Sequence, residues 1–213
     1  MNHPLVILDL DDTLYLERDF AFSGYRAVDL FLRQQARLGG FAAFAAIAFE
    51  QGSRARLVHD FLAAEKISDE TLATKAIDVY RNHLPDIALC PDANDFLNAH
   101  APETLAMITD GHPVTQWNKI RQLGLIGRIG RIIVTGDWGR EFWKPHPRAY
   151  LELQGARPPE DCLYIADNPQ KDFDAPAMLG WQPSLRIRRP GSLHYDLKTP
   201  PSCVELISLA EMC

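Results

Sequence analysis

The sequence has few cysteines, no excess of positive charge and no long apolar run, and each absence narrows the range of functions. The 213-residue chain contains 4 cysteines. None forms a CxxC pair or stands beside a histidine at the spacing of a metal site, so neither a disulfide framework nor a zinc site is predicted. Scattered thiols are typical of a reducing compartment, and we expect a cytoplasmic location.

Charge and hydropathy exclude two classes of partner. The formal net charge of −6 provides no general attraction to nucleic acid or to an anionic membrane. No stretch approaches the ~20 apolar residues that a transmembrane helix requires. The apolar run after Met1 is interrupted by Asp9 and is too short for a signal peptide. We expect no nucleic-acid and no membrane partner, and the sequence leaves a homodimer open.

The order of apolar and polar segments indicates the fold. Short apolar segments at residues 4–10, 104–110, 131–137, 162–167 and 183–188 are predicted strands, and segments with helical periodicity separate the later ones. Such alternation predicts an α/β fold with a Rossmann-like, doubly wound parallel sheet covered on both faces. Residues 18–87 interrupt it with helical periodicity alone. They are predicted to form an inserted α-helical cap domain, and residues 1–17 and 88–213 the α/β core.

Polar side chains follow the predicted strands at the points where they end. In parallel sheets ligands bind beyond the carboxyl ends of the strands, so these side chains are expected to converge. Gathered carboxylates repel one another and lose water, which is costly unless a cation joins them. Mg²⁺ prefers oxygen ligands and is commonly held by one or two carboxylates together with phosphate oxygens. The strand-end residues are Asp9, Asp11, Thr109, Asp110, Asp167, Asn168 and, shortly after, Asp172.

A lysine is predicted to join this group. Lys144 directly precedes Pro145, which favours an extended backbone just ahead of a predicted helix. From that position its ammonium group can reach across the carboxyl edge of the sheet. It would then neutralise charge that develops on a phosphoryl group.

Four segments together resemble the ordered motifs of the haloacid dehalogenase-like hydrolase superfamily. They are "DLDDTLY" from Asp9, "MITDG" from Met107, "KPHP" from Lys144 and "IADNPQKD" from Ile165. Their order and spacing are similar to those of the phosphatase branch that carries a helical cap after the first strand. Two positions depart from the pattern: Ala166 stands where glycine is common, and Asp110 where asparagine is frequent.

The resemblance implies a role for each residue. Asp9 would attack phosphorus to give an aspartyl-phosphate, and Asp11 would protonate the leaving alcohol and then activate water. Thr109 and Asp110 would bind the phosphoryl group, and Lys144 would balance its charge. Mg²⁺ would be held by Asp9, by the backbone carbonyl of Asp11 and by Asp167. The supporting residues would be Thr13, which orders the turn and bonds to Asp11, together with Asn168 and Asp172.

The implied activity is Mg²⁺-dependent hydrolysis of a phosphomonoester in a small metabolite, such as a nucleotide or a sugar phosphate. Three alternatives remain. A 2-haloacid dehalogenase uses the same nucleophile but neither a metal nor an acid two residues on. A phosphomutase shares every motif with the phosphatase. A non-catalytic binding module would usually have lost the nucleophile or the lysine, and both are present here.

Overall fold

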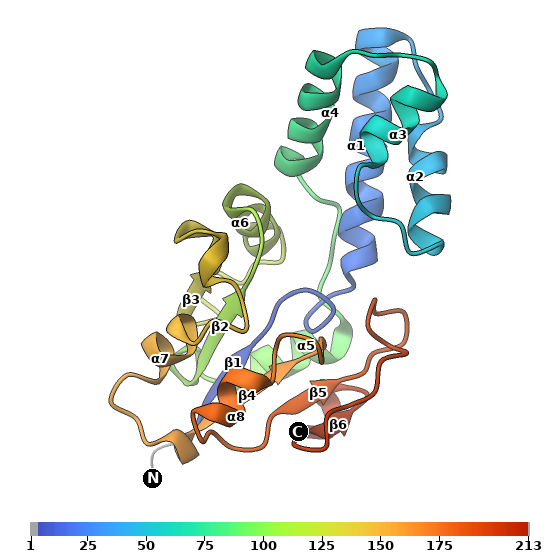
Figure 1. The fold of residues 1–213 in the computed structure, drawn as a ribbon. Coiled ribbons are helices and arrows are strands. Elements are labelled where there is room, and N and C mark those ends of the chain that lie inside the picture. Colours follow the sequence, from blue (N-terminus) through green and yellow to red (C-terminus); the bar gives the residue numbers. More distant parts are fainter. Residues whose placement is uncertain (1–3, 213) are drawn as a thin grey trace. The chain divides into compact units, whose positions relative to one another are not determined.

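The computed structural model describes residues 4–212, and these fall into two compact units (Figure 1). The first, which we call the α/β unit, joins the N-terminal segment up to Arg18 to the segment from Ile87 onward. The second, which we call the helical unit, is Asp19–Asp86. The helix α1 (Glu17–Ala36) begins at the end of the first segment and continues into the helical unit.

The helical unit is built from amphipathic helices. After α1 come α2 (Phe41–Glu50), α3 (Leu57–Ala64) and α4 (Glu70–Asn82). Apolar residues spaced three and four apart give α1 one buried stripe, which includes Tyr25, Val28 and Leu32. Aromatic rings fill the space between the helices: the ring centroids of Tyr25 and Phe41 lie 6.1 Å apart in an edge-on arrangement.

Six parallel strands form the sheet of the α/β unit, in the order β3-β2-β1-β4-β5-β6. This order is that of a doubly wound α/β sheet, so the predicted fold class is confirmed. The first strand along the chain lies in the middle, between β2 and β4. The strand bounds are β1 Leu5–Leu8, β2 Leu105–Thr109, β3 Arg131–Val134, β4 Cys162–Ala166, β5 Leu185–Ile187 and β6 Val204–Leu206.

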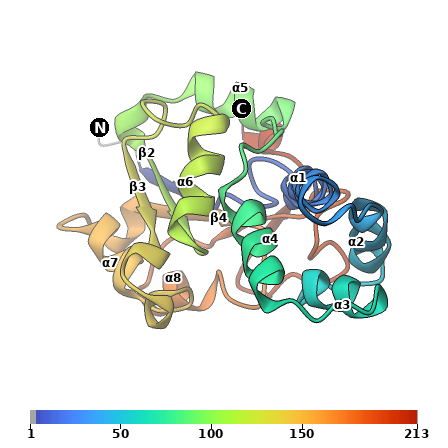
Figure 2. The same cartoon turned by 90° about the horizontal axis from the view of Figure 1, so that it is seen from above.

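Helices cover both faces of this sheet. Those of the α/β unit are α5 (Pro91–Ala99), α6 (Pro113–Gln122), α7 (Arg148–Gln154) and α8 (Asp174–Met178). In Figures 1 and 2, α5 lies on one side of the central strands, and α7 and α8 lie on the other. The central strands are buried on both faces, which explains why their sequences are continuous apolar runs rather than alternating ones.

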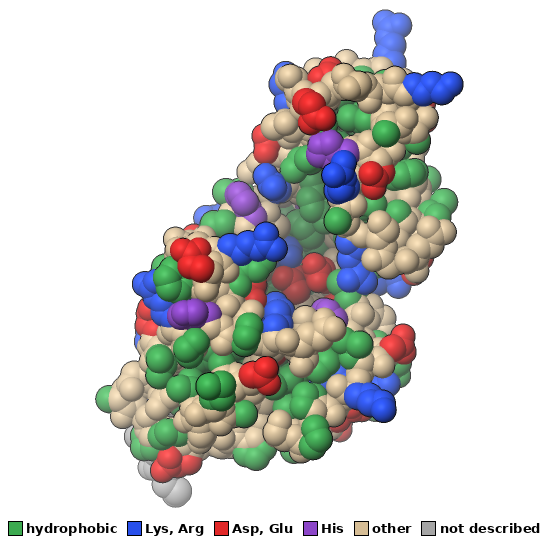
Figure 3. Space-filling model, viewed as in Figure 1, with side chains coloured by type: hydrophobic (Ala, Val, Ile, Leu, Met, Phe, Trp, Pro, Cys, Tyr) green, Lys and Arg blue, Asp and Glu red, His purple; other side chains and the backbone are tan. Residues whose placement is uncertain are grey.

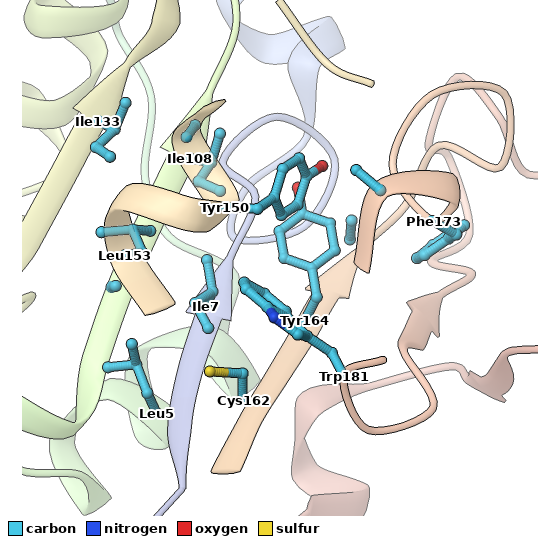
Figure 4. Packing of buried hydrophobic residues seen from close by; sticks show 14 residues of the cluster. Leu5, Ile7, Ile108, Ile133, Tyr150, Leu153, Cys162, Tyr164, Phe173 and Trp181 are labelled. Atoms are coloured by element: carbon cyan, nitrogen blue, oxygen red, sulfur yellow. The ribbon is translucent and has the colours of Figure 1, made fainter. Parts of the chain in front are cut away.

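One face of the sheet packs as a dense cluster under α7 and α8 (Figure 4). Successive side chains of a strand point to opposite faces, so Leu5 and Ile7 of β1 enter this cluster together. The rings of Tyr150 and Tyr164 meet edge-on in it, with centroids 5.2 Å apart. This cluster fixes the two tyrosines directly beneath the carboxyl ends of β1 and β4.

Three details differ from the sequence prediction. The strand β6 was not predicted, because it has three residues, is largely exposed and follows a proline-rich segment. The third strand ends at Val134 rather than at residue 137, since Thr135–Asp137 form a 3₁₀ turn. The helix after the fourth strand begins only at Asp174, because the preceding residues form the turn that carries Asn168 and Asp172.

Helix hydropathy, surface charge and the state of the cysteines complete the description of the structure. Among residues 4–212, none of the helices combines the length and the hydropathy needed to cross a membrane. Figure 3 shows acidic and basic side chains interspersed with apolar ones, and the coloured residues on that face include no continuous basic surface. Cys90, Cys162 and Cys203 are free thiols, and Cys213 lies outside the described residues.

Candidate active site

The ends of β1 and β4 bring the first and the last of the four motifs together. The backbone N–H of Asp9 donates to the carbonyl of Ile165 at 2.9 Å, so Asp9 continues the β1–β4 pairing to the edge of the sheet. Asp167 directly follows β4 on the neighbouring strand. The order of the strands along the chain reverses at β1, which is where ligands bind in open α/β sheets.

Lys144 stands between two carboxylates. Its Nζ lies 2.6 Å from Oδ1 of Asp9 and 2.7 Å from Oδ1 of Asp172. The hydroxyl of Tyr164 accepts a further hydrogen bond from it at 3.1 Å. Burial alone would lower the pKa of Lys144, but the charges of Asp172, Asp9 and Asp110 outweigh it and hold that pKa well above its usual range. The lysine is therefore a permanent, fixed positive charge beside Asp9.

Three neighbouring carboxylates, two of which also contact Lys144, have the donor set of a metal site. Oxygen atoms of Asp9, Asp167 and Asp172 all lie within 4.8 Å of one another, and all three residues are buried. Burial, only partly opposed by Lys144, raises the pKa of Asp9 to about 6. Burial and the charges of Asp9 and Asp172 also raise the pKa of Asp167 well above its usual range. A hard divalent cation would remove this repulsion, so these residues fit a Mg²⁺ ion.

The partner of Asp167 does not supply the missing charge. Nδ1 of His194 lies 2.8 Å from Oδ2 of Asp167. Burial lowers the pKa of His194 below its usual value, which works against a positive charge on the ring. His194 and Asp12 also lie within 4.8 Å of the Asp167 carboxylate. However, Asp12 accepts the backbone N–H groups of Glu17 and Leu193 and thereby caps α1.

The carboxylate of Asp11 contacts Lys119 and Gln116 of α6 rather than Lys144. It accepts hydrogen bonds from Lys119 at 2.7 Å, from Gln116 at 3.0 Å and from the hydroxyl of Tyr15. Burial alone would raise its pKa, but the charge of Lys119 and these hydrogen bonds lower it overall. The side chain of Asp11 is thus outside the metal-type group, and only its backbone carbonyl remains as its predicted metal ligand.

Thr109 is joined to Asp11 through Gln116. Nε2 of Gln116 donates to Oγ1 of Thr109 at 2.6 Å as well as to Asp11. This arrangement needs a glycine at position 111, where φ is +137° and an added Cβ would lie 3.0 Å from the side chain of Gln116. The Thr109 hydroxyl and the Asp11 carboxylate are therefore linked by one amide.

Asp110 anchors the motif that carries Lys144. Its Oδ1 accepts the hydroxyl of Thr135 at 2.7 Å and the backbone N–H of Lys144 at 3.1 Å, and its Oδ2 pairs with Lys171 at 3.0 Å. The ammonium group of Lys171 explains why a carboxylate suits this position, where the resembling family frequently has asparagine. These contacts tie the Asp110 carboxylate to the backbone of Lys144 and to Lys171.

The predicted contact of Thr13 is absent, whereas Asn168 contributes to a turn of the site. The hydroxyl of Thr13 is buried and has no hydrogen-bond partner among residues 4–212, so its predicted bond to Asp11 is absent. The main chain of Thr13 instead accepts a bond from Arg189. Asn168 accepts the N–H of Gln170, and its own N–H donates to Asp172 at 3.1 Å. It therefore shapes the turn that aims Asp172 at Lys144.

Several site residues were missed by the sequence prediction. Gln116 and Lys119 lie three residues apart on α6, so both face the interior, and polar residues in a buried helical stripe are the signal that could have found them. Tyr164 lies inside a buried strand, and His194 in a proline-containing loop, where the sequence carries no comparable signal.

The arrangement suits attack by a carboxylate. Asp9 is placed beside a fixed ammonium group and a metal-type acidic group, and a carboxylate needs no base to act as a nucleophile. A hydroxyl and a second carboxylate complete the set. Such a site can stabilise negative charge on a group that is transferred to Asp9.

Comparison with known proteins supports this interpretation. A family model described as "haloacid dehalogenase-like hydrolase" matches residues 3–180. A glyceraldehyde 3-phosphate phosphatase of Methanopyrus kandleri is 31% identical over 88 residues, which are 40% of this chain and 36% of that protein. A phosphoserine phosphatase of Thermus thermophilus is 33% identical over 97 residues, which are 43% of this chain and 38% of that protein. The matches thus span less than two fifths of either curated relative.

Solved structures match over nearly the whole chain but at low identity, and so show the fold alone. The putative HAD-hydrolase YfnB of Bacillus subtilis, bound to magnesium, superposes with a TM-score of 0.65 at 20% identity, covering 100% of this chain and 97% of that one. A putative β-phosphoglucomutase of Thermotoga maritima superposes with a TM-score of 0.66 at 18% identity, covering 97% of this chain and 95% of that one. A 2-haloacid dehalogenase of Pseudomonas syringae superposes with a TM-score of 0.65 at 21% identity, covering 99% of this chain and 96% of that one.

Proposed function

The chain belongs to the haloacid dehalogenase-like hydrolases, and from this premise we propose that it is a Mg²⁺-dependent phosphomonoesterase that acts on a small phosphorylated metabolite. The observation that carries the proposal is the placement of Asp9. Its carboxylate lies 2.6 Å from a buried ammonium group and within 4.8 Å of two further carboxylates. A nucleophile, a fixed positive charge and oxygen ligands for a cation therefore share one strand end.

In the proposed reaction Asp9 attacks phosphorus and forms an aspartyl-phosphate. Lys144 orients the attacking carboxylate and offsets charge on the phosphoryl oxygens, while Thr109 hydrogen-bonds one of them. Asp11 gives a proton to the ester oxygen of the leaving alcohol, and as a carboxylate it then takes one from the water that hydrolyses the intermediate. Such acid–base assistance contributes typically ~10²–10⁴-fold.

The carboxylates of Asp9 and Asp167 and the backbone carbonyl of Asp11 would hold Mg²⁺. When bound, the ion supplies positive charge against the phosphoryl oxygens. Asp172 is committed to Lys144 at 2.7 Å, and we therefore assign it to holding the lysine in place. His194 orients the Asp167 carboxylate from its other side.

We further propose that the helical unit acts as a cap that admits small substrates and excludes large ones. The curated relatives are named for the phosphate esters of a sugar-like aldehyde and of an amino acid, which supports a small metabolite but does not select one. We also propose a cytoplasmic location, supported by the three described cysteines that form no disulfide.

The contacts of Asp11 disfavour a 2-haloacid dehalogenase, since that chemistry has no use for an acid two residues after the nucleophile. Three donors that hold Asp11 in place indicate that its side chain has a task. A phosphomutase would use every residue assigned above. A phosphatase and a phosphomutase differ only in whether the phosphoryl group is transferred to water or to a second hydroxyl group.

The test is hydrolysis of 4-nitrophenyl phosphate by purified protein with Mg²⁺, with release of free phosphate measured in parallel. Asp9→Asn should abolish turnover, and Asp95→Asn, an exposed aspartate on α5, should not. Chelation of the metal should stop turnover and added Mg²⁺ should restore it. Full activity of Asp9→Asn would refute the assigned nucleophile, and indifference to chelator with release of halide from 2-chloropropionate would favour the dehalogenase.

A further inference from the structure

The acid Asp11 is held by a buried lysine that the proposed roles do not include. The side chain of Lys119 is only 4% exposed, and its Nζ lies 2.7 Å from Oδ1 of Asp11. The same ammonium group lies 5.9 Å from the centre of the Tyr15 ring, and the hydroxyl of Tyr15 also donates to Asp11. Both donors therefore converge on the acid.

Stability alone does not account for this pair. Removing a lysine from water is costly, and a buried ion pair often stabilises a fold no more than well-packed apolar side chains of similar volume do. Apolar side chains at both positions would fill similar volume without that cost. The lysine is more readily explained if it holds the Asp11 side chain in place for the reaction.

We infer that Lys119 is a positioning residue for protonation of the leaving group, an inference that rests on the proposed phosphomonoesterase activity. In that step an oxygen of Asp9 bonds to phosphorus, and the bond from phosphorus to the ester oxygen breaks with its electron pair on that oxygen. The proton of the Asp11 carboxyl group moves to the same oxygen, which leaves a carboxylate 2.7 Å from the ammonium group of Lys119. Lys119 on Oδ1 and Gln116 on Oδ2 thus hold both oxygens of the Asp11 carboxyl group and fix the direction from which the proton is delivered.

Gln116 extends this arrangement to the phosphoryl group. One face of α6 carries both Gln116 and Lys119, and the Gln116 amide bridges Asp11 at 3.0 Å and Thr109 at 2.6 Å. The same helix therefore fixes the acid and the hydroxyl that binds phosphate. Loss of Gln116 should therefore affect both protonation and phosphate binding, whereas loss of Lys119 should affect protonation.

The size of the effect should depend on the leaving group. An acid that is out of place slows a reaction most where the transition state needs most proton transfer. A 4-nitrophenol leaves as a stable anion and needs little proton transfer, whereas a more basic phenol needs much. Loss of Lys119 should therefore weaken hydrolysis of esters with basic leaving groups most.

The experiment measures kcat/KM for a series of substituted phenyl phosphates, from 4-nitrophenyl to 4-methoxyphenyl, with Mg²⁺ present. Lys119→Met should lose about 10-fold on the first and about 100-fold or more on the last, within the range of acid catalysis. Arg121→Met, an exposed cation on the same helix, should change no member of the series. Gln116→Met should show the same trend, smaller, and serves if Lys119→Met does not fold.

An equal loss across the series would overturn the inference, since a merely structural role lowers every rate alike. The double variant Asp11→Asn with Lys119→Met should be no slower than Asp11→Asn, because nothing then remains to be positioned, and an additional loss would also overturn it. Wild-type protein that hydrolyses none of the esters would refute the proposed function itself. The two failures are therefore distinguishable.

Discussion

Replacing Asp92 with asparagine should measurably destabilise the α/β unit. Asp92 lies in the first turn of α5 and pairs with both terminal nitrogens of Arg189, at 2.8 and 2.9 Å. Its Oδ2 also accepts the hydroxyl of Ser208 and the N–H of Leu209, each at 2.8 Å. One carboxylate thereby fastens α5 to the loop after β5 and to the C-terminal 3₁₀ turn.

The magnitude follows from the pKa. Burial alone would raise the pKa of Asp92, but the hydrogen bonds from Arg189, Leu209 and Ser208 lower it from 3.8 to about 2. At about 1.4 kcal/mol per pH unit this corresponds to roughly 2 kcal/mol. Solvent screening of the partly exposed pair reduces it to about 1–2 kcal/mol, or a fall in Tm of about 3–6 °C for a chain of this size.

The sign of the pH dependence is fixed, because folding lowers this pKa. The stabilisation is complete above the unfolded-state pKa near 4 and is lost as the pH falls toward about 2. Urea unfolding gives the difference in free energy of unfolding between wild type and Asp92→Asn. This gap should be about half as large at pH 3 as at pH 7. The matched control is Asp95→Asn on the same helix. A gap below about 0.5 kcal/mol at pH 7, or one that does not narrow, would refute the reasoning.

Three further predictions concern the site. Lys144→Met should lower kcat/KM for an aryl phosphate by about 10²–10³-fold, whereas the control Lys198→Met, at an exposed position, should not. A loss below about 10-fold for Lys144→Met would contradict the role of this lysine. Burial raises the pKa of Asp9 to about 6, so Mg²⁺ must displace a proton from this residue below that pH. Calorimetry should therefore find tighter Mg²⁺ binding at pH 7 than at pH 5, and equal affinity at the two pH values would count against the site. Asp110→Asn keeps an acceptor for Thr135 but loses the pair with Lys171, so activity should fall less than 10-fold and more only if Asp110 binds substrate.

The sequence predicted most of the fold because the central strands are buried on both faces. Such strands are continuous apolar runs, and β1, β2 and β4 were readable for that reason. The strand β6 carries no such signal, since its residues are mostly exposed and only pairing with β5 defines it. Short exposed strands depend on tertiary contacts that the sequence does not display.

The site was predictable where each residue stands at a strand end. Asp9 and Asp167 follow neighbouring strands, so their convergence follows from topology alone. The side-chain direction of Asp11 did not follow, because it depends on Gln116 and Lys119, which lie more than a hundred residues away. Contacts of that kind are set by the packing of a helix, not by local sequence.

The central claim is that Asp9 itself becomes phosphorylated. Protein mixed with 4-nitrophenyl phosphate and Mg²⁺, quenched in acid within the first turnover and digested, should give a peptide with one phosphoryl group on Asp9, identified by mass spectrometry. The same peptide from Asp9→Asn should carry none. A phosphoryl group on another residue, or rapid hydrolysis with no phosphorylated peptide at any time, would contradict the account.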